Sequence, residues 1–366
     1  MTDITIYYPT YTDITSWNKK PYSSTGGTRA KNIYTNQEQK EYFFKGSKKL
    51  DDGTFRYPME FWSEIASSKI GQWLGFDLLD YNIAFDLNDE QQIGCLSKSM
   101  VEYTENRLSE GIDFLRGYDS NYNPNNDESR YTFDFIKKTL GYFNLTEFES
   151  KLIEMIIFDS IIGNSDRHQE NWGFISKFKE TIQEIDKEIE TKKGFFSKIE
   201  PKLRKFHAKF TLSQRLLDEE KNKNPHKFTL INQSLVVLNE FSPIYDSGCC
   251  LGRELVDDRI YKQLKDKQMM EAFLNNGKSE IRIVEGKNKP NHFVLLSTLK
   301  NDYKKVFSDT LSKINGVYTK SNLELIINNI DRELPVQLIK YKLPDHRKEL
   351  MIKLIDLRIN KLNNLK

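Results

Sequence analysis

The chain has 366 residues, of which 38% are hydrophobic and 12% aromatic, and its 55 basic and 53 acidic residues give a formal net charge of +2. This length fits two lobes or domains better than one small core, and the aromatic content excludes wholesale disorder. The nearly balanced charge gives no sign of a nucleic-acid-binding surface.

Cysteine content and the absence of export signals favour the reducing cytoplasm. Cys95, Cys249 and Cys250 are odd in number, and two of them are adjacent, which does not make a disulfide framework. The N-terminal residues have neither the basic start nor the apolar stretch of a secretory signal, and no run reaches the ~18 apolar residues of a membrane span. We expect a cytoplasmic protein, and delivery to a host by a dedicated secretion system stays open.

The N-terminal quarter predicts a small sheet with one helix. Residues 1–21 show no clear period, and a Gly/Ser/Thr cluster is then followed by alternation. Residues 41–46 form a β-type run, and apolar positions in residues 59–74 recur at helical spacing until Gly75. Two β-like runs follow at 78–87 and 93–103. Residues 22–103 therefore predict the order strand, strand, helix, strand, strand.

The rest of the chain predicts mainly helices. A polar loop at 117–129 precedes helical patterns, and the highly charged segment 177–222 predicts an inserted helical hairpin. A β-like run follows at 233–250, and residues 252–366 are again helical in pattern. We expect an α+β protein with a β-rich N-terminal lobe of residues 1–101, a helical lobe of residues 102–366, and a ligand cleft between them.

The segment 166–171 carries the strongest chemical signal. Asp166 and Asn171 lie five residues apart, after an apolar helix and a Gly-Asn turn. On one loop the two side chains can face one site, where Asp166 would accept the proton of an attacking hydroxyl and Asn171 would bind magnesium. Taken alone, the spacing is common, and turn or cap roles explain it better.

Further residues fit phosphoryl transfer. Asp246 follows a β-like run and precedes a glycine turn, which suits a second magnesium ligand. Lys45 ends a predicted strand and would contact nucleotide phosphates, oriented by Glu64 of the next helix. Glu60, one turn earlier, is the alternative to Glu64.

A glycine cluster precedes Lys45. Gly26, Gly27 and Thr28 belong to the segment Ser23–Arg29, whose backbone N–H groups can turn toward a phosphate. The segment is neither a GxGxxG nor a Walker A loop, and by itself it is better explained as a plain turn. The order of loop, lysine, glutamate, aspartate, asparagine and aspartate across the two lobes nevertheless predicts a kinase that uses ATP and Mg²⁺.

The motifs also resemble a known family. IIGNSDRHQENWGFI and FSPIYDSGCCLG, with the closing HRKELMIKLIDLRINKL, are similar to segments of the HipA family of bacterial serine/threonine kinases. Because few residues precede the glycine loop, the chain resembles the compact CtkA-like or HipT-like members. The resemblance implies a bilobal protein-kinase-like fold with ATP and magnesium, with Asp166, Asn171 and Asp246 in the roles given above.

The resemblance implies further roles. His168 would face the phosphates, Tyr245 would lie against the nucleotide, and the backbone near Lys98 and Met100 would form the hinge. Autophosphorylation is expected on a Ser or Thr within residues 23–28. A protein substrate is implied, whereas an antitoxin or regulatory partner and a toxin or effector role stay open. No direct contact with nucleic acid or with a membrane is expected, since no basic amphipathic helix stands out.

Two other functions compete with a protein kinase. Asp-Arg-His-x-x-Asn is also similar to the catalytic loop of phosphatidylinositol kinases, so a lipid or small-molecule kinase is the alternative. A non-catalytic nucleotide-binding module that keeps the fold is the third possibility.

Overall fold

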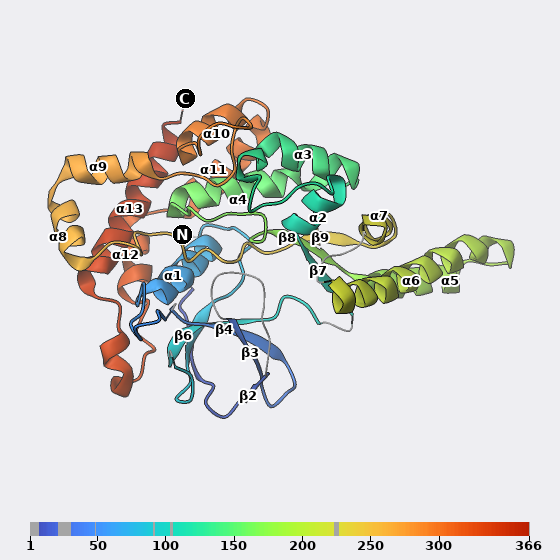
Figure 1. Cartoon of the computed structure of the whole chain (residues 1–366), viewed down its shortest axis with the longest axis horizontal. Helices are drawn as coiled ribbons and strands as arrows, with labels where there is room; N and C mark the ends of the chain where they lie inside the picture. Colours follow the sequence, from blue (N-terminus) through green and yellow to red (C-terminus); the bar gives the residue numbers. More distant parts are fainter. Residues whose placement is uncertain are drawn as a thin grey trace.

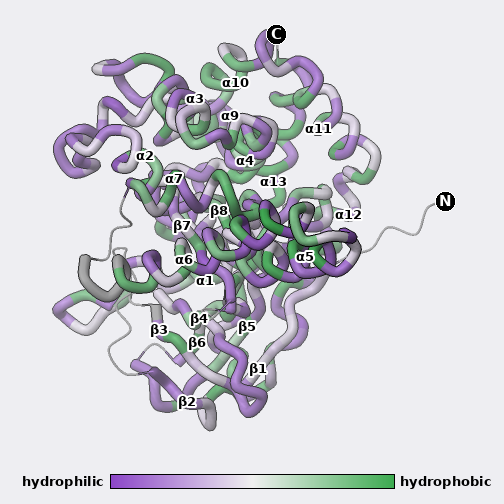
Figure 2. Tube along the Cα trace, turned by 90° about the vertical axis from the view of Figure 1, so that its right-hand side faces the viewer, coloured by the Kyte–Doolittle hydropathy of each residue, from purple (hydrophilic) through white to green (hydrophobic). Residues whose placement is uncertain are grey.

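The computed structural model describes residues 7–20, 31–47, 49–90, 92–102, 105–222 and 227–365. A β-rich N-terminal part lies beside a larger helical part, as the α+β prediction requires (Figure 1). Figure 2, turned by 90°, shows strands β1 to β6 at one end of the molecule and the helical part above them. Within the described residues, no helix is long and apolar enough to cross a membrane.

The N-terminal sheet has six strands in the order β1-β5-β6-β4-β3-β2. Strand β1 pairs in parallel with β5, and all other neighbouring strands of the sheet are antiparallel. The predicted order of strand, strand, helix, strand, strand is present as β3, β4, α1, β5 and β6. The first 21 residues add two short strands where the sequence shows no period. The bounds are β1 Tyr11–Asp13, β2 Asn18–Lys19, β3 Lys31–Thr35, β4 Glu41–Lys45, β5 Asn82–Phe85 and β6 Ile93–Lys98.

Helix α1 (Glu60–Trp73) covers this sheet and joins it to the rest of the molecule. Its apolar residues Phe61, Ile65 and Ile70 are buried, as their helical spacing predicts. Gly75, with φ of +85°, follows the helix end, and this left-handed conformation favours glycine. The core around α1 is continuous with that of the helical part. A small separate core in the sheet consists of Ile14, Tyr34, Phe44, Ala84 and Leu96. The boundary at residues 101–102 stays a prediction.

Helix α4 (Glu149–Ile162) forms the centre of the helical part. Ten of its residues are buried, and it contacts α10, α11 and α13. A helix apolar on nearly all sides requires neighbours on nearly all sides. The other helices of this part are α2 Gly111–Tyr118, α3 Phe133–Tyr142, α8 Asp257–Lys265, α9 Lys267–Asn276, α10 His292–Lys300, α11 Lys304–Val317, α12 Lys320–Asn328 and α13 Asp345–Asn363.

The helical part contains a second sheet, of three antiparallel strands. Its order is β7 (Arg107–Glu110), β8 (Gly173–Ser176) and β9 (Asn239–Phe241). Between β8 and β9 the chain forms α5 (Phe178–Thr191) and α6 (Ile199–Asn222), which pack on each other as the predicted hairpin and extend away from the body (Figure 1).

The predicted β-run at 233–250 is partly wrong. Its first residues lie in helix α7 (Lys227–Val236), and only β9 is a strand. The Leu-Val-Val-Leu stretch has strand propensity, but α7 packs against α2 and α6. Buried Gln233 also donates a hydrogen bond to Ser176 of β8. These tertiary contacts outweigh the local preference.

Gly163, which ends α4, provides a test of this architecture. Its φ of +69° is left-handed, and an added Cβ would lie 2.8 Å from Nη2 of Arg358. We expect Gly163→Ala to lower the free energy of unfolding by about 1–3 kcal/mol, from backbone strain and the displaced guanidinium. Thermal unfolding followed by circular dichroism measures the effect.

Gly316→Ala in α11 is the matched control. Nothing lies within 4 Å of its added Cβ, and its φ is not in the left-handed region. Alanine there should raise helix stability by about 0.5–1 kcal/mol. Equal melting temperatures for the two variants would contradict the conformation assigned to Gly163.

Candidate active site

Lys45 and Glu64 meet where the sheet faces α1. Lys45 ends β4, and its Nζ lies 3.1 Å from Oε2 of Glu64. Both side chains are almost fully buried, with exposed fractions of 7% and 1%. Because a buried charge requires a partner, each residue fixes the other. Glu60, the alternative of the sequence analysis, instead forms an ion pair with Arg253.

The same two residues reach the segment that carries Asp246. Lys45 Nζ donates to Oδ1 of Asp246, and Glu64 Oε1 accepts a 2.8 Å hydrogen bond from the Ser247 backbone N–H. Asp246 has φ of +53°, an uncommon conformation for a residue with a side chain, and such strain is concentrated at functional sites. Glu64 therefore connects the N-terminal lobe to the helical lobe at this point.

The loop after α4 presents Asp166 and Asn171. Nδ2 of Asn171 donates to the Asp166 backbone carbonyl at 2.7 Å, so the amide oxygen of Asn171 is the atom that remains to bind a cation. Oδ2 of Asp166 accepts a hydrogen bond from the buried Cys249 thiol, with an S–O distance of 3.0 Å. The Ser165 N–H donates to the Cys249 carbonyl at 3.1 Å, which holds the two segments side by side.

Arg167 lies beneath this loop and is 1% exposed. Its Nε and Nη2 each donate to Asp159 of α4 at 2.9 Å, a bidentate pair. Nη1 donates to the carbonyls of Asn171 and Tyr245, and Nη2 also donates to Ser247 Oγ. All five guanidinium donors are thus used. One side chain joins α4, the loop that carries Asp166, and the segment that carries Asp246.

Burial and charge act in opposite directions on the groups at this site. Burial alone would lower the pKa of Arg167, but the Asp159 carboxylate more than offsets it, so the pKa is raised and the guanidinium stays charged. Burial, with the nearby charges of Glu64 and Asp246, raises the pKa of Tyr81 well above its usual value. The neutral Tyr81 hydroxyl accepts a weak 3.4 Å hydrogen bond from the Asp246 N–H.

Other predicted site residues lie nearby with less specific contacts. His168 is half-buried, and its Nδ1 accepts a 3.3 Å hydrogen bond from the Glu170 N–H. Tyr245 is buried, and its hydroxyl donates to the Glu170 carbonyl at 3.0 Å, which places the ring under the loop. Lys98 is the exposed last residue of β6, and Met100 follows in the connection to the helical lobe.

The predicted glycine loop, with Gly26, Gly27 and Thr28, lies outside the described residues. The structure therefore adds nothing to the prediction for this segment.

Sequence reasoning missed the residues that support the site. Asp159 was not singled out, Ser247 and Cys249 lie within FSPIYDSGCCLG but were assigned no role, and Arg167 was noted only as part of Asp-Arg-His. Their contacts span up to 183 positions of sequence, as between Ser247 and Glu64, and 83 positions between Cys249 and Asp166. The one available signal was Asp159, a charged residue inside the otherwise apolar run MIIFDSII, because such a residue requires a buried partner.

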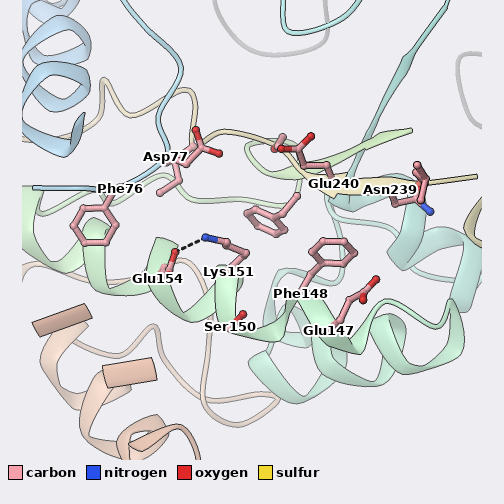
Figure 3. A pocket seen from close by; sticks show the side chains of 13 residues that line it. Phe76, Asp77, Glu147, Phe148, Ser150, Lys151, Glu154, Asn239 and Glu240 are labelled. Carbon is pink, nitrogen blue, oxygen red and sulfur yellow. Dashed lines mark hydrogen bonds and ion pairs between the residues drawn. The ribbon is translucent and has the colours of Figure 1, made fainter. Parts of the chain in front are cut away.

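A separate pocket of about 480 Å³ lies behind the segment that leads to Asp246. Its floor is α4, where Lys151 and Glu154 form a 3.0 Å ion pair, and Asp77 and Glu240 lie opposite (Figure 3). Burial, then the neighbouring Glu240 charge, raises the pKa of Asp77. None of the predicted site residues lines this pocket.

The two lobes, the single helix against the sheet and the Lys45–Glu64 pair facing Asp246 define a bilobal protein-kinase-like fold. Among solved structures, the chain is similar to the Helicobacter pylori proinflammatory kinase CtkA. The two share 17% sequence identity with a TM-score of 0.63, over 98% of this chain and all of that one. At this identity the likeness establishes the fold. No protein-family model and no curated protein sequence matches the chain.

The Arg167–Asp159 pair provides a test of what holds the site. Arg167→Met leaves Asp159 charged and buried without its guanidinium, which should cost about 3–5 kcal/mol of folding free energy. The double variant Arg167→Met/Asp159→Leu removes that uncompensated charge and should be less destabilised than the single variant. Chemical denaturation of wild type and both variants measures these differences.

Arg332→Met is the control for this comparison. Arg332 is half-exposed and pairs with the equally exposed Glu333, so its loss should change stability by about 0–1 kcal/mol. If the double variant were as unstable as Arg167→Met, the buried charge would not be the origin of the effect.

Proposed function

We propose that the chain is an ATP- and magnesium-dependent serine/threonine protein kinase of HipA-like type. The observation that carries the proposal is the arrangement of Lys45 between Glu64 and Asp246. In phosphoryl transfer a lysine oriented by a glutamate contacts the nucleotide phosphates, and a nearby aspartate binds the metal. The fold shared with a kinase and the adjacent loop of Asp166 and Asn171 support the same conclusion.

The residues present fit a magnesium ion held together with phosphates. Within the part of the chain that the structure describes, no group of three or more His, Cys, Asp or Glu side chains could hold a metal. The Asn171 amide oxygen and the Asp246 carboxylate would supply two oxygen ligands. Magnesium commonly takes one or two protein carboxylates and completes its shell with water and substrate phosphates. When bound, the ion neutralises charge on the transferring phosphate.

Each residue then has a defined task. Lys45 contacts the phosphates once a cation competes for Asp246, and Glu64 keeps its ammonium in place. Asp166 accepts the proton of the substrate hydroxyl, whose oxygen forms the new bond to phosphorus as the bond to the ADP oxygen breaks. The Cys249 thiol, which donates to Oδ2 of Asp166, fixes the carboxylate orientation so that Oδ1 faces the substrate.

The catalytic assignment is tested by two substitutions. Asp166→Asn removes the proton acceptor and should lower phosphate transfer from labelled ATP at least about 100-fold, while nucleotide binding with magnesium persists. Asp246→Ala should abolish transfer and also weaken the magnesium-dependent thermal shift produced by ATP. Transfer to a mixture of protein substrates and to phosphoinositide vesicles is measured in parallel.

Asp258→Asn, on the exposed start of α8, is the matched control and should leave transfer unchanged. Full activity of both site variants would remove the assignment. Transfer to phosphoinositide but not to protein would favour the lipid-kinase alternative. Magnesium-dependent nucleotide binding without any transfer would favour a non-catalytic module.

Autophosphorylation within residues 23–28 is part of the same proposal. This segment contains Ser23, Ser24, Thr25 and Thr28, next to the two glycines of the predicted phosphate-binding loop. A phosphate there would add close to two negative charges where nucleotide phosphates should bind, and should therefore inhibit. Phosphopeptide mapping of wild type should find phosphate in this segment, and the Asp166→Asn protein should lack it.

Unmodified residues 23–28 in fully active protein would remove the autophosphorylation proposal. A toxin or effector role is tested separately. Phosphoproteomics after expression of wild type and Asp166→Asn should show target proteins modified only by the wild type.

A further inference from the structure

The helical hairpin between β8 and β9 carries an unusual concentration of positive charge. Residues 192–210 contain seven Lys and Arg residues and one acidic residue, Glu200, a net charge of 7 − 1 = +6. The whole chain has a net charge of only +2. This basic segment forms the tip of the hairpin and the first half of α6, which extend away from the body (Figure 1).

The same segment exposes a row of large apolar side chains. Phe196, Ile199, Leu203, Phe206 and Phe210 are spaced 3 or 4 residues apart, so they share one face of the helix. All five are exposed, Phe196 by 86% and Phe206 by 64%. Phe195 lies beside Phe196 at the tip and is 73% exposed. We call these six residues the apolar ridge.

The apolar ridge is not the surface on which α6 packs. The opposite face of the helix is buried through Pro201, Ala208, Thr211 and Arg215. Ala208 belongs to a small core with Phe178 of α5. The hairpin is therefore stabilised on its inner face, and the apolar ridge lies outside that core.

The acidic helix α5 neutralises only some of the positive charges. Arg204 and Lys192 pair with Glu188, and Lys205 pairs with Asp186. Among the described residues, no ion pair involves the other four lysines of the segment: Lys193, Lys198, Lys202 and Lys209. Three of these, Lys198, Lys202 and Lys209, lie along one flank of the apolar ridge at helical spacing.

Exposed phenylalanines flanked by unpaired lysines are the pattern of a helix that lies in a membrane interface. Clusters of four to eight basic residues on an amphipathic helix attract anionic lipids. A second copy of the chain fits poorly, because it would bring the same lysines against each other. From these observations we propose that the apolar ridge binds an anionic phospholipid bilayer, with its phenylalanines among the acyl chains and its lysines at the headgroups.

This proposal is independent of the proposed kinase activity. It differs from the expectation of the sequence analysis that the chain makes no membrane contact, and the vesicle experiment below decides between the two. That expectation relied on sequence alone, in which the apolar positions of α6 are indistinguishable from those of a helix that faces a core. The absence of a membrane-spanning helix from the described residues is compatible with it, because the contact is peripheral.

Co-sedimentation of the full chain with vesicles tests the proposal. We expect binding to phosphatidylcholine vesicles that contain about one third phosphatidylserine, and little binding to pure phosphatidylcholine. Binding should weaken when salt is raised from about 0.1 M to 1 M, where the screening length falls from ~10 Å to ~3 Å. Equal binding to both kinds of vesicle, or no binding to either, would overturn the proposal.

Two sets of variants locate the contact. Lys198→Gln/Lys202→Gln/Lys209→Gln should weaken binding to the anionic vesicles roughly 100-fold, and Phe195→Ser/Phe196→Ser/Phe206→Ser should reduce it to the level of pure phosphatidylcholine. The matched controls change exposed residues elsewhere. They are Lys304→Gln/Lys305→Gln/Lys320→Gln and Val256→Ser/Val336→Ser/Ile339→Ser, and both should bind as the wild type does.

Circular dichroism should show that all four variants keep the wild-type fold, since no buried side chain changes. If the control variants also bound the vesicles more weakly, the apolar ridge would not be the membrane-binding surface. Sedimentation velocity tests the alternative that the apolar ridge mediates self-association. A concentration-dependent dimer that the phenylalanine variant loses, without vesicle binding by the wild type, would assign the apolar ridge to self-association instead.

Discussion

The burial of one positive charge constrains the arrangement of the whole site. A guanidinium in the interior loses its hydration, and this cost is offset only when a carboxylate and further acceptors surround it. Arg167 meets this requirement with acceptors from three separate stretches of chain. The end of α4, the loop of Asp166 and the segment of Asp246 therefore have to meet at one point. Any conformation that separates them leaves a charge or a carbonyl unpaired in the interior.

A second constraint links the lobes. The two carboxylate oxygens of Glu64 are used in different ways, one by the Lys45 ammonium and the other by the Ser247 backbone. Helix α1 is thus hydrogen-bonded both to the strand that carries the lysine and to the segment that carries Asp246. Because Lys45 and Glu64 are buried, rotation of α1 away from the site would leave the Glu64 carboxylate without its lysine, while Lys45 would keep Asp246. The contacts of Glu64 at the site therefore form only when α1 has this orientation.

The sequence predicted the parts of this structure that depend on local pattern. The apolar spacing of Phe61, Ile65 and Ile70 identified α1, and motif order placed Lys45 and Glu64 on neighbouring elements. Sequence-based prediction failed where contacts between residues far apart in the chain determine the local structure. Val236 has strand propensity yet ends a helix, because α7 packs on α2 and α6. The contact between Cys249 and Asp166 has no local signal, and the exposure of Phe206 depends on which face of α6 meets α5.

The position of the inserted hairpin has a mechanical consequence. Strand β8 begins two residues after Asn171, and β9 ends five residues before Asp246, while the strands themselves pair through Phe174 and Phe241. The insertion therefore begins and ends on two hydrogen-bonded neighbours, whatever its length. This ladder links the base of the hairpin to the segments that carry Asn171 and Asp246, in addition to the ion pairs of Arg215 with Asp113 and of Lys179 with Glu105. A displacement of the protruding hairpin would therefore act first on the strand pair that lies next in sequence to the two predicted metal ligands.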